Sequence, residues 1–434
     1  MAEEFFTWLQ REKRLELSAQ QRQAVETTEG AVLLTATPGS GKTTVIVCRT
    51  AYLLREKKIP AGQILTLTFG KQSQLDMDRR FAALFPEMEK PRFSTLHALS
   101  LSILRRYCEI TGGAMFSLLP DSAPVVRELL RKQINGFISE ELLRNALSAL
   151  ECEAVQTGKH TAQSVEGCDM EQLLQDYALY KRERRLMDFS DLLRYADRAL
   201  ERVPALLAEL QARYPYVQID EAQDTSPIQQ RIAGRIAQQT GNLFLVGDED
   251  QSIYGFRAAW PQALTQFDAV YPHAKVLYME QNYRSRAPIV QAADTFIQRN
   301  QNRRPKHMRP TRGSGPAVRE ISVYDRLKQY RYLCKVAENC TAETAVLYRD
   351  NDSALPLIDQ MDRQGIPYRC RQVESLFFTN RVVRDITDII RFAQDPTDGT
   401  LFETLYYKLG AGISKALARE AIAWAQREGE TLLG

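Results

Sequence analysis

The segment that most restricts how this chain can fold spans Ala31–Thr43 and reads AVLLTATPGSGKT. Its first residues are mostly apolar, which predicts a short buried strand, and a helix is expected to begin near Lys42. In the loop between them, Gly39 and Gly41 allow the backbone to curl so that its N–H groups point inward. The amino terminus of the helix adds partial positive charge at the same place. Together these features predict a loop that binds phosphate.

Two residues at the end of this loop have the chemistry that a nucleoside triphosphate requires. Lys42 is long enough to reach the β- and γ-phosphates, and the Thr43 hydroxyl is a ligand for Mg²⁺. Ala36 departs from the usual pattern, which has glycine at this first position, but that position lies farthest from the phosphates. The alternative is a glycine-rich turn that binds nothing. A strand before the loop and a helix after it would favour the phosphate site.

Charge and cysteine content exclude several classes of protein. The net charge is only +3, so any surface for nucleic acid has to be a local patch. None of the seven cysteines forms a C-x-x-C pair, which argues against zinc sites and disulfide frameworks. The amino terminus is charged, and no apolar run approaches the length of a membrane span. We expect a cytoplasmic protein without a membrane segment.

Strands and helices alternate on both sides of the phosphate loop. Ser18 followed by Gln21 predicts a helix start with a capping box, which by itself accounts for Gln21. A helix is expected at 72–85, and short strands at 63–69, 92–96, 216–220, 242–246 and 275–278. This alternation predicts an α/β fold with a parallel sheet that is covered by helices on both faces.

Two regions interrupt or follow this alternation. Between about 108 and 200, helices but no strand are predicted, at 121–135, 139–150, 170–183 and 189–202. A second α/β unit is expected from about 280, with strands at 318–321, 344–347 and 368–370, and helices follow from about 380. The basic stretch at 299–313 is predicted to be a solvated loop, with a phosphate-contacting surface as the alternative.

A second chemical centre is predicted where the strand at 216–220 ends, in the sequence YVQIDEAQD. Downstream of a phosphate loop, Asp220 is expected to hold Mg²⁺ through water, and Glu221 to orient or deprotonate an attacking water. The alternative is a strand end whose acidic residues simply meet solvent. The alternating α/β context favours the catalytic pair.

Two further loops combine charged and aromatic side chains. The loop after the strand at 242–246 carries Asp248, Asp250, Gln251, Tyr254, Phe256 and Arg257. Exposed rings beside arginine suit stacking on the bases of a single strand, and packing of the rings over the end of the sheet is the alternative. In QNYRSR at 281–286, Tyr283 is able to stack on a base and Arg284 and Arg286 to contact phosphate, with plain surface charge as the alternative.

These segments, in this order, resemble the superfamily 1 DNA helicases of the UvrD/Rep/PcrA type over almost the whole chain. LSAQQRQAV resembles the adenine-reading Q motif, ATPGSGKTT motif I, LTLTFGKQSQLDM motif Ia and FSTLHAL motif Ib. IDEAQD resembles motif II, VGDEDQSIYGFRAA motif III and QNYRS motif IV. Smaller matches are MDFSDLL, VLYRDN, GIPYRC and the trio Asn300, Arg303 and Lys306.

The resemblance implies a site for ATP and Mg²⁺ and a track for single-stranded DNA. Gln21 would read the adenine, Tyr283 would stack on it, and Gln251 and Arg284 would sense the γ-phosphate. The implied catalytic residues are Lys42, Glu221, Gln251 and Arg284, and the implied metal ligands are Thr43 and Asp220. The implied ATP-binding residues are Gln21, Ala36, Thr37, Pro38, Gly39, Ser40, Gly41, Lys42, Thr43, Thr44, Tyr283 and Arg284. The implied DNA-binding residues are Phe69, Thr95, His97, Tyr254, Phe256 and Arg257. For His97, the residues alone favour an ordinary histidine at a helix start.

The resemblance also implies a domain order and an activity. A RecA-like P-loop domain 1A would comprise residues 1–107 and 201–278 around a helical insertion 1B at 108–200. An incomplete RecA-like domain 2A at 279–375 and the start of a helical 2B region at 376–434 would follow. The implied activity is ATP-driven 3′ to 5′ translocation on single-stranded DNA, with unwinding of tailed duplexes. The alternatives are a non-motor ATP- or DNA-binding module and, less well supported, an unrelated P-loop kinase or GTPase.

Several positions depart from the family pattern. Thr44 stands where many relatives have an arginine near the nucleotide, and Phe256 replaces the usual tryptophan but keeps a stacking face. Residues 70–74 differ from the usual motif Ia, which weakens that DNA contact. No segment resembles motifs V and VI, so the sequence is interpreted as a fragment of a helicase.

Phe256→Ala is expected to weaken binding of single-stranded DNA by about 1–3 kcal/mol, because a stacked base would lose its ring partner. The measurement is a DNA titration followed by fluorescence anisotropy, with a melting curve as the control. A large fall in melting temperature with unchanged DNA affinity would instead support packing of the ring against the sheet.

Residues 1–434 are expected to bind Mg-ATP but not to unwind DNA, since a missing arginine donor to the γ-phosphate costs on the order of 10³–10⁵ in rate. The measurement is strand displacement on a duplex with a 3′ tail, beside a longer protein that contains motifs V and VI. ATP-dependent displacement by residues 1–434 alone would contradict this expectation.

Overall fold

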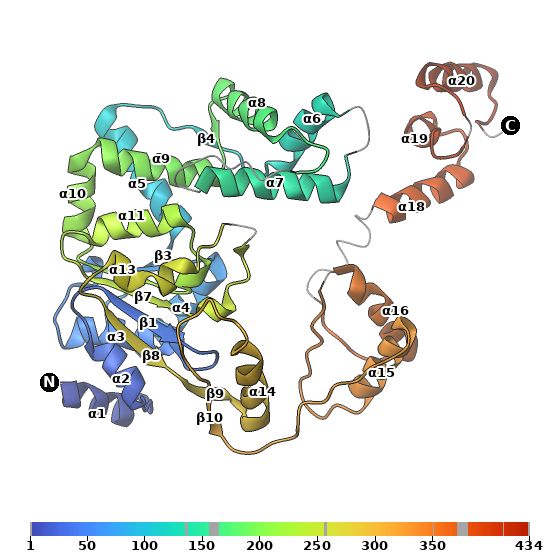
Figure 1. The fold of residues 1–434 in the computed structure, drawn as a ribbon. Helices are drawn as coiled ribbons and strands as arrows, with labels where there is room; N and C mark the ends of the chain where they lie inside the picture. The colour runs from blue at the N-terminus through green and yellow to red at the C-terminus, as the bar shows by residue number, and fades with distance from the viewer. Residues whose placement is uncertain are drawn as a thin grey trace. The chain divides into compact units, whose positions relative to one another are not determined.

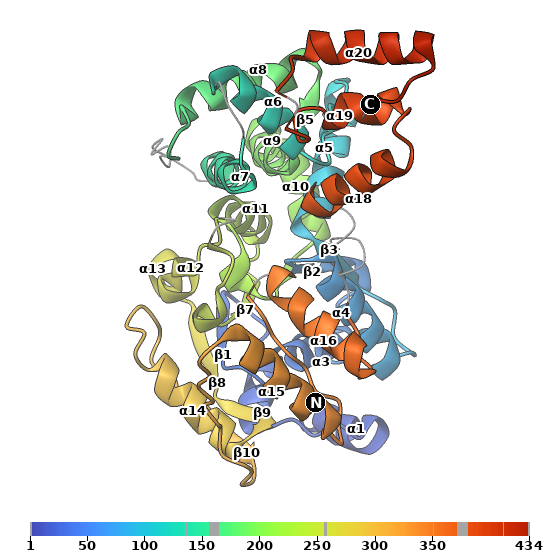
Figure 2. The same ribbon diagram turned by 90° about the vertical axis from the view of Figure 1, so that its right-hand side faces the viewer.

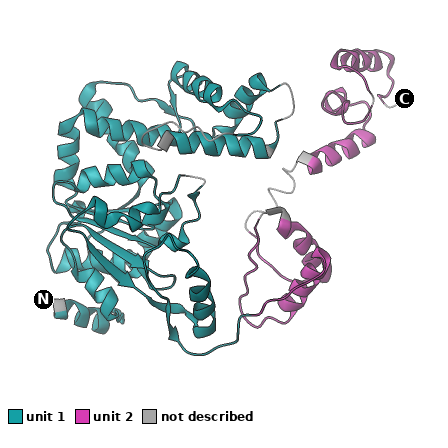
Figure 3. Cartoon of the chain, in the orientation of Figure 1, with its two compact units in different colours: residues 1–318 teal, residues 319–434 magenta. Residues whose placement is uncertain are grey.

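A computed structural model describes residues 2–134, 138–155, 165–255, 258–349, 351–370, 381–410 and 412–432. The chain divides into two compact units, residues 1–318 and 319–434, which Figure 3 distinguishes by colour. None of the helices in these described ranges is long and apolar enough to cross a membrane.

The first unit is built on a six-stranded parallel sheet with the order β3-β2-β6-β7-β1-β8. Its strands are β1 (Val32–Ala36), β2 (Ile64–Thr68), β3 (Arg92–Thr95), β6 (Tyr216–Ile219), β7 (Leu243–Gly247) and β8 (Lys275–Met279). The predicted α/β class and the predicted strands of this sheet are therefore confirmed. Because the strands are parallel, the loops that follow them all lie at one edge.

Helices cover both faces of this sheet (Figure 1). One layer contains α1 (Ala2–Lys13), α2 (Ala19–Glu26), α3 (Lys42–Arg55) and α4 (Lys71–Leu84). The other contains α5 (Leu96–Thr111), α9 (Phe189–Arg202), α10 (Pro204–Arg213), α11 (Pro227–Ala237), α12 (Gln262–Thr265) and α13 (Phe267–Val270). Side chains that alternate along a strand enter opposite layers: Leu34 packs with the first layer and Leu33 with the second.

The helical insertion has an apolar core of its own. It contains α6 (Ala123–Gln133), α7 (Glu140–Val155) and α8 (Met170–Glu183), which lie together in Figure 2. Val126, Leu130 and Leu173 are fully buried among them. The prediction that this region has no strand was wrong, because β4 (Ser117–Leu118) pairs with β5 (Leu186–Met187). Strands of two residues are too short to give a periodic pattern.

The chain leaves the sheet at β8 and continues almost directly into β9 (Gln281–Arg286). After α14 (Ala287–Ile297), β10 (Arg309–Arg312) pairs in parallel with β9. Residues 281–312 thus belong to the first compact unit, although the sequence pattern placed them in domain 2A. The division into domains 1A, 1B, 2A and 2B stays a prediction.

The second unit contains two small apolar clusters. One joins α15 (Arg326–Glu338) to α16 (Leu355–Gln364), and the other joins α18 (Arg381–Gln394), α19 (Gly399–Leu405) and α20 (Lys415–Glu428). Four short 3₁₀ helices complete the described elements: η1 (Ala61–Gln63), η2 (Ala222–Asp224), η3 (Glu249–Gln251) and η5 (Asn351–Ala354). The helices predicted beyond residue 380 are confirmed where the structure describes them.

The strands predicted at 318–321, 344–347 and 368–370 were wrong. The structure gives these residues no strand conformation, and Leu347 is 94% exposed. A strand requires a neighbour that accepts and donates its backbone hydrogen bonds, and no described segment pairs with these residues. An apolar pattern therefore predicted strands for which the described chain supplies no partner.

Candidate nucleotide-binding site

The phosphate loop has the backbone conformation that its glycines permit. Gly39 and Gly41 have φ values of 71° and 90°, in the left-handed region that other residues rarely adopt. A Cβ atom at Gly41 would lie 2.8 Å from Gln21 Nε2. The Ser40 hydroxyl donates to the Thr37 carbonyl at 2.6 Å, which folds the loop back on itself. Because α3 begins at Lys42 without a side-chain cap, its first N–H groups are available to an anion.

Gln21 contributes both to a helix start and to the phosphate loop. Its Oε1 accepts from the Ser18 N–H at 3.0 Å, which completes the capping box that the sequence predicted. Its Nε2 donates to the Ser40 carbonyl at 2.8 Å and is buried there. Gln21 is therefore held against the loop, and its contact with an adenine stays a prediction.

The two predicted chemical centres meet across the end of the sheet. Lys42 Nζ lies 3.2 Å from Glu221 Oε2, although β7 separates β1 from the strand that carries Glu221. Glu221 itself has a φ of 49°, an unusual value that places its side chain at the turn after β6. Asp220 is only 4% exposed, and its Oδ1 accepts from the Glu221 N–H at 3.0 Å. The sequence prediction that these residues face the loop is consistent with this geometry.

Burial makes the Asp220 carboxylate energetically unfavourable in the protein alone. Desolvation, reinforced by the neighbouring charge of Glu221, raises the pKa of Asp220 to about 7. A cation beside this carboxyl would favour its ionised form. Among the described residues no three acidic, histidine or cysteine side chains form a metal cage. Mg²⁺ typically uses one or two protein ligands together with phosphates and water. Asp220 and the half-buried Thr43 are suitable ligands.

Gln223 links the carboxylates of Glu221 and Asp224 to the loop after β7, and the sequence reasoning gave it no role. Its Nε2 donates to Glu221 Oε2 at 2.9 Å and to Asp224 Oδ2 at 3.2 Å. Its Oε1 accepts from the Asp248 N–H at 3.0 Å. An amide has both a donor and an acceptor, so it is able to join an acidic group to a backbone N–H. An amide two residues after the Asp-Glu pair was the available signal.

The sequence reasoning also gave no role to Asp224, an acidic residue next to Gln223. It is 8% exposed, and its Oδ1 has no hydrogen-bond partner among the described residues. Burial, together with the charge of Glu221, raises the pKa of Asp224 to about 6. The carboxyl therefore holds a proton at a higher pH than an ordinary aspartate.

Asn282 fastens β9 to the phosphate loop, and the sequence reasoning also missed this residue. Its Nδ2 donates to the Pro38 carbonyl at 2.7 Å, and the Tyr283 N–H donates to the Gly39 carbonyl at 2.9 Å. Its Oδ1 accepts from the N–H groups of Arg284 and Ser285 at 2.9 and 2.8 Å. The strand that carries Tyr283 and Arg284 thus begins beside the loop, as the predicted nucleotide roles require.

The remaining ATP-site predictions find the following positions. Ala36 ends β1, and Thr37 Oγ1 donates to the Met279 carbonyl at 3.1 Å, so both residues are buried parts of the loop entrance. Thr44 is half-buried in the first turn of α3. Tyr283 is 41% exposed, and its hydroxyl donates to Gln281 Oε1. Gln251 Nε2 donates to Asp248 Oδ2 at 2.6 Å.

The residues predicted for the DNA track lie at the same edge, after β2, β3 and β7. The rings of Phe69 and Tyr254 stack with centroids 5.0 Å apart, and both are half-buried. Thr95 accepts from the Ala98 N–H at 3.1 Å and caps α5. His97 packs edge-on against Phe189, and burial lowers its pKa, while its contact with DNA stays a prediction. Phe256 and Arg257 lie outside the described residues.

The basic stretch at 299–313 is only in part the solvated loop that was predicted. Residues 299 and 309–313 are exposed, but Arg303, Arg304 and Lys306 pair with acidic residues of the first unit. Lys306 is 2% exposed. Composition showed that this stretch is basic, but it did not show which residues pair with it. Its acidic partners lie some 50 residues earlier in the chain, from Asp248 to Asp268.

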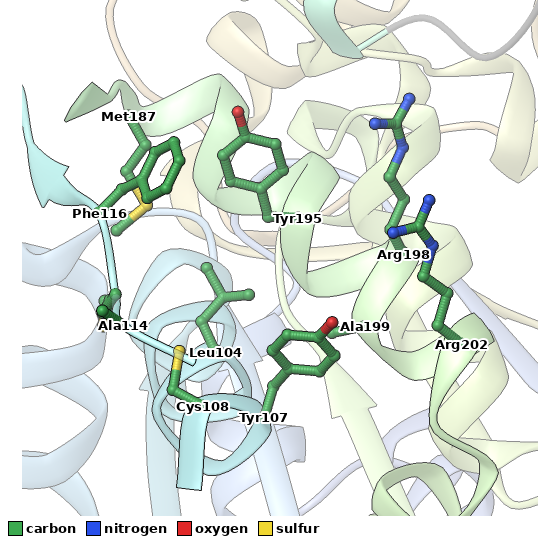
Figure 4. Close-up of a pocket in the computed structure, with 11 residues that line it drawn as sticks. Leu104, Tyr107, Cys108, Ala114, Phe116, Met187, Tyr195, Arg198, Ala199 and Arg202 are labelled. Atoms are coloured by element: carbon green, nitrogen blue, oxygen red, sulfur yellow. The ribbon is translucent and has the colours of Figure 1, made fainter. Parts of the chain in front are cut away.

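A cavity of about 290 Å³ lies elsewhere in the first unit, between α5 and α9. Figure 4 shows apolar side chains such as Leu104 and Met187 in its wall and the guanidinium groups of Arg198 and Arg202 near each other. None of the predicted site residues lines this cavity. The candidate nucleotide site is therefore formed by the loops at the sheet edge and not by this cavity.

Comparisons with known proteins match both parts of the chain to one family. Residues 17–272 match the family model of the UvrD/REP helicase N-terminal domain, and residues 277–428 match that of the UvrD-like helicase C-terminal domain. The chain is 30% identical over 397 residues to the ATP-dependent DNA helicase PcrA of Staphylococcus epidermidis, covering 88% of this chain and 54% of that protein. The PcrA proteins of Leuconostoc citreum (30% over 406 residues, 89% and 54% covered) and Bacillus subtilis (29% over 434 residues, 95% and 58% covered) are also similar. The chain spans about half the length of these curated relatives.

Asp224→Asn is expected to change how stability depends on pH. The pKa of Asp224 is about 6 in the fold. Its ordinary value is about 3.9, so the folded protein binds the proton more tightly than the unfolded chain between these values. The free energy of unfolding should therefore fall as pH rises from about 4 to 6, by about 1–3 kcal/mol, and the variant should lack this part of the fall. Urea unfolding at several pH values measures it.

The matched control is Asp76→Asn, which removes a half-exposed carboxylate. This variant should keep the pH dependence of the unchanged protein. Identical slopes for the Asp224 variant and the unchanged protein would contradict the raised pKa.

Proposed function

Because this chain belongs to the UvrD/REP helicase family, we propose that it binds and hydrolyses ATP and forms part of a motor that moves along single-stranded DNA. The observation that carries the proposal is the 3.2 Å contact of Lys42 with Glu221 beside the buried Asp220. A glycine-rich turn without a ligand would gain nothing from a carboxyl kept buried at the end of β6, two strands away in the sheet.

The proposed chemistry follows from the charges around the loop. Lys42, now paired with Glu221, turns toward the β- and γ-phosphate oxygens and neutralises the charge that develops there. Glu221, released from that pair, accepts a proton from the attacking water. Thr43 and Asp220 would hold Mg²⁺, which would supply further positive charge beside the phosphates. Gln251 and Arg284 contact the γ-phosphate, and Gln21 and Tyr283 hold the adenine.

The proposed DNA contacts use the loops after β2, β3 and β7. The stacked pair of Phe69 and Tyr254 offers aromatic surface at the edge where the nucleotide site also lies. Base stacking on such rings is tolerant of sequence, as a translocating motor requires. We propose that Thr95, His97, Phe256 and Arg257 line the same track. The proposed substrates are single-stranded and tailed duplex DNA, with movement from 3′ to 5′.

We also propose that the protein works in the cytoplasm. None of the seven cysteines forms a disulfide, and four of them are not fully buried. Exposed thiols persist in a reducing compartment, whereas proteins of oxidising compartments tend to pair them.

In any complete version of this protein, Lys42→Ala is expected to abolish ATP hydrolysis, because it removes the charge that neutralises the β/γ oxygens. Glu221→Gln should still bind ATP but should lose about 10²–10⁴-fold in turnover, since an amide accepts no proton. Nucleotide binding and phosphate release measure the two properties separately. Normal turnover by Glu221→Gln would show that the assigned role is wrong.

Lys132→Ala is the matched control, because Lys132 pairs with Glu128 on the exposed surface of α6. Its ATP affinity and turnover should equal those of the unchanged protein. Binding of ATP or of DNA without any hydrolysis by the unchanged protein would favour the alternative of a non-motor binding module.

A further inference from the structure

A buried group of charges joins the loop after β7 to the segment between α14 and β10. We call residues 248–251 the acidic loop. Lys306 Nζ lies 3.0 Å from Asp248 Oδ1 and 2.6 Å from Glu249 Oε1. The same nitrogen lies 3.0 Å from Asp250 Oδ2. The side chains of Lys306 and Asp248 are 1% and 0% exposed, so one ammonium group contacts three consecutive residues of the acidic loop away from solvent.

Lys306 supplies one of the two positive charges that face three carboxylates in this cluster. Arg303 pairs with Asp250 at 2.8 Å, and the Arg304 N–H donates to Glu249 Oε1 at 2.7 Å. Burial lowers the pKa of Lys306, but the carboxylates of Asp248 and Glu249 outweigh burial and raise it above its ordinary value. Lys306 is therefore charged. Without it, three buried carboxylates would face a single arginine, a costly arrangement in a poorly solvated place.

The acidic loop carries a residue of the proposed nucleotide site. Gln251 donates to Asp248 Oδ2, while Asp248 Oδ1 faces Lys306. One carboxylate thus stands between Lys306 and Gln251. The backbone N–H of Asp248 is also tied through Gln223 to Glu221. The place of Gln251 depends on where Asp248 is held.

The segment that carries Lys306 is itself fastened to the phosphate loop through β10 and β9. Thr311 Oγ1 donates to the Asn282 carbonyl at 2.8 Å, and the Asn282 side chain donates to Pro38 of the phosphate loop. Arg309 N–H donates to the Glu280 carbonyl at 2.8 Å. Figure 1 shows β9 and β10 side by side below α14. Lys306 therefore connects the acidic loop to an element that is anchored beside the phosphates.

We propose that Lys306 is a positioning residue for ATP hydrolysis, which holds Asp248 and, through it, Gln251 in a fixed place relative to the phosphate loop. This inference rests on the proposed function, because that proposal assigns the γ-phosphate to Gln251. It predicts that loss of Lys306 loosens the acidic loop and slows turnover, while ATP affinity changes little.

The first experiment needs no enzymatic activity. Hydrogen exchange is measured on nucleotide-free Lys306→Met and on the unchanged protein. Peptides that cover residues 248–252 should exchange about tenfold faster or more in the variant, while peptides from β2 should not change, because local opening is confined to the released loop. Equal protection of residues 248–252 in both proteins would overturn the inference. A chain without ATPase activity would refute the proposed function but leave this result decisive.

The second experiment asks whether Lys306 acts through Gln251. In Lys306→Met, kcat should fall about tenfold or more with nucleotide affinity unchanged within about twofold. In a Gln251→Ala background, Lys306→Met should cost no further turnover, because the group it positions is already absent. Multiplied losses in the double variant, or a lower melting temperature with normal kcat, would show a purely structural role.

Two further variants distinguish a loss of positioning from a general loss of stability and from the effect of replacing any lysine. The double variant with Lys306→Met and Glu249→Gln removes one charge of each sign. It should therefore be more stable than Lys306→Met alone, while Asp248 still lacks its partner. Its acidic loop should exchange fast and its kcat should remain low, and recovery of both properties would overturn the inference. Lys132→Met, on the exposed surface of α6, should behave as the unchanged protein does.

Discussion

The parallel direction of the six strands is the constraint on which the rest of the structure depends. Strands that run the same way all end at one edge, so residues from distant parts of the sequence are brought together there. Lys42 follows β1 and Glu221 follows β6, and they make contact although β7 lies between their strands. The ring pair of Phe69 and Tyr254 forms at the same edge from the ends of β2 and β7. The geometry of the sheet thus places a candidate nucleotide site beside a candidate DNA surface at the same edge.

Several charged side chains lie buried at this edge of the sheet. Their desolvation is unfavourable, and neighbouring charged groups offset part of it. Asp220 and Asp224 are buried carboxyls whose pKa values are raised to about 7 and about 6 by desolvation and by Glu221. In the acidic loop, Arg303 and Lys306 lie at hydrogen-bonding distance from Asp250 and hold its pKa below the ordinary value despite burial. The contrast separates two kinds of acidic residue: those already neutralised by the protein, and those whose ionised form would be stabilised by an incoming cation.

Several residues at the site serve the fold as well as the proposed chemistry. Gln21 completes a capping box and also holds the Ser40 carbonyl, and Thr95 caps α5 at the end of β3. Asn282 accepts a hydrogen bond from a backbone N–H within β9 and also donates to the Pro38 carbonyl. Substitution of such a residue therefore affects local structure and ligand contacts together. Gln251, Glu221 and Lys42 have no such capping duty in the described structure, so changes there report on chemistry more directly.

The sequence alone determined the phosphate loop, the parallel strands around it and the acidic pair after β6, because these depend on local backbone freedom and on short-range periodicity. It also indicated the family through the order of its motifs. It did not determine that Gln223 and Asn282 would join neighbouring loops, or that Lys306 of the basic stretch would be buried against Asp248–Asp250. It predicted strands at 318–321 and 344–347 that the described structure leaves unpaired. These features were decided by the tertiary structure, because a hydrogen bond, an ion pair or a strand ladder needs a partner whose distance in space the sequence does not specify.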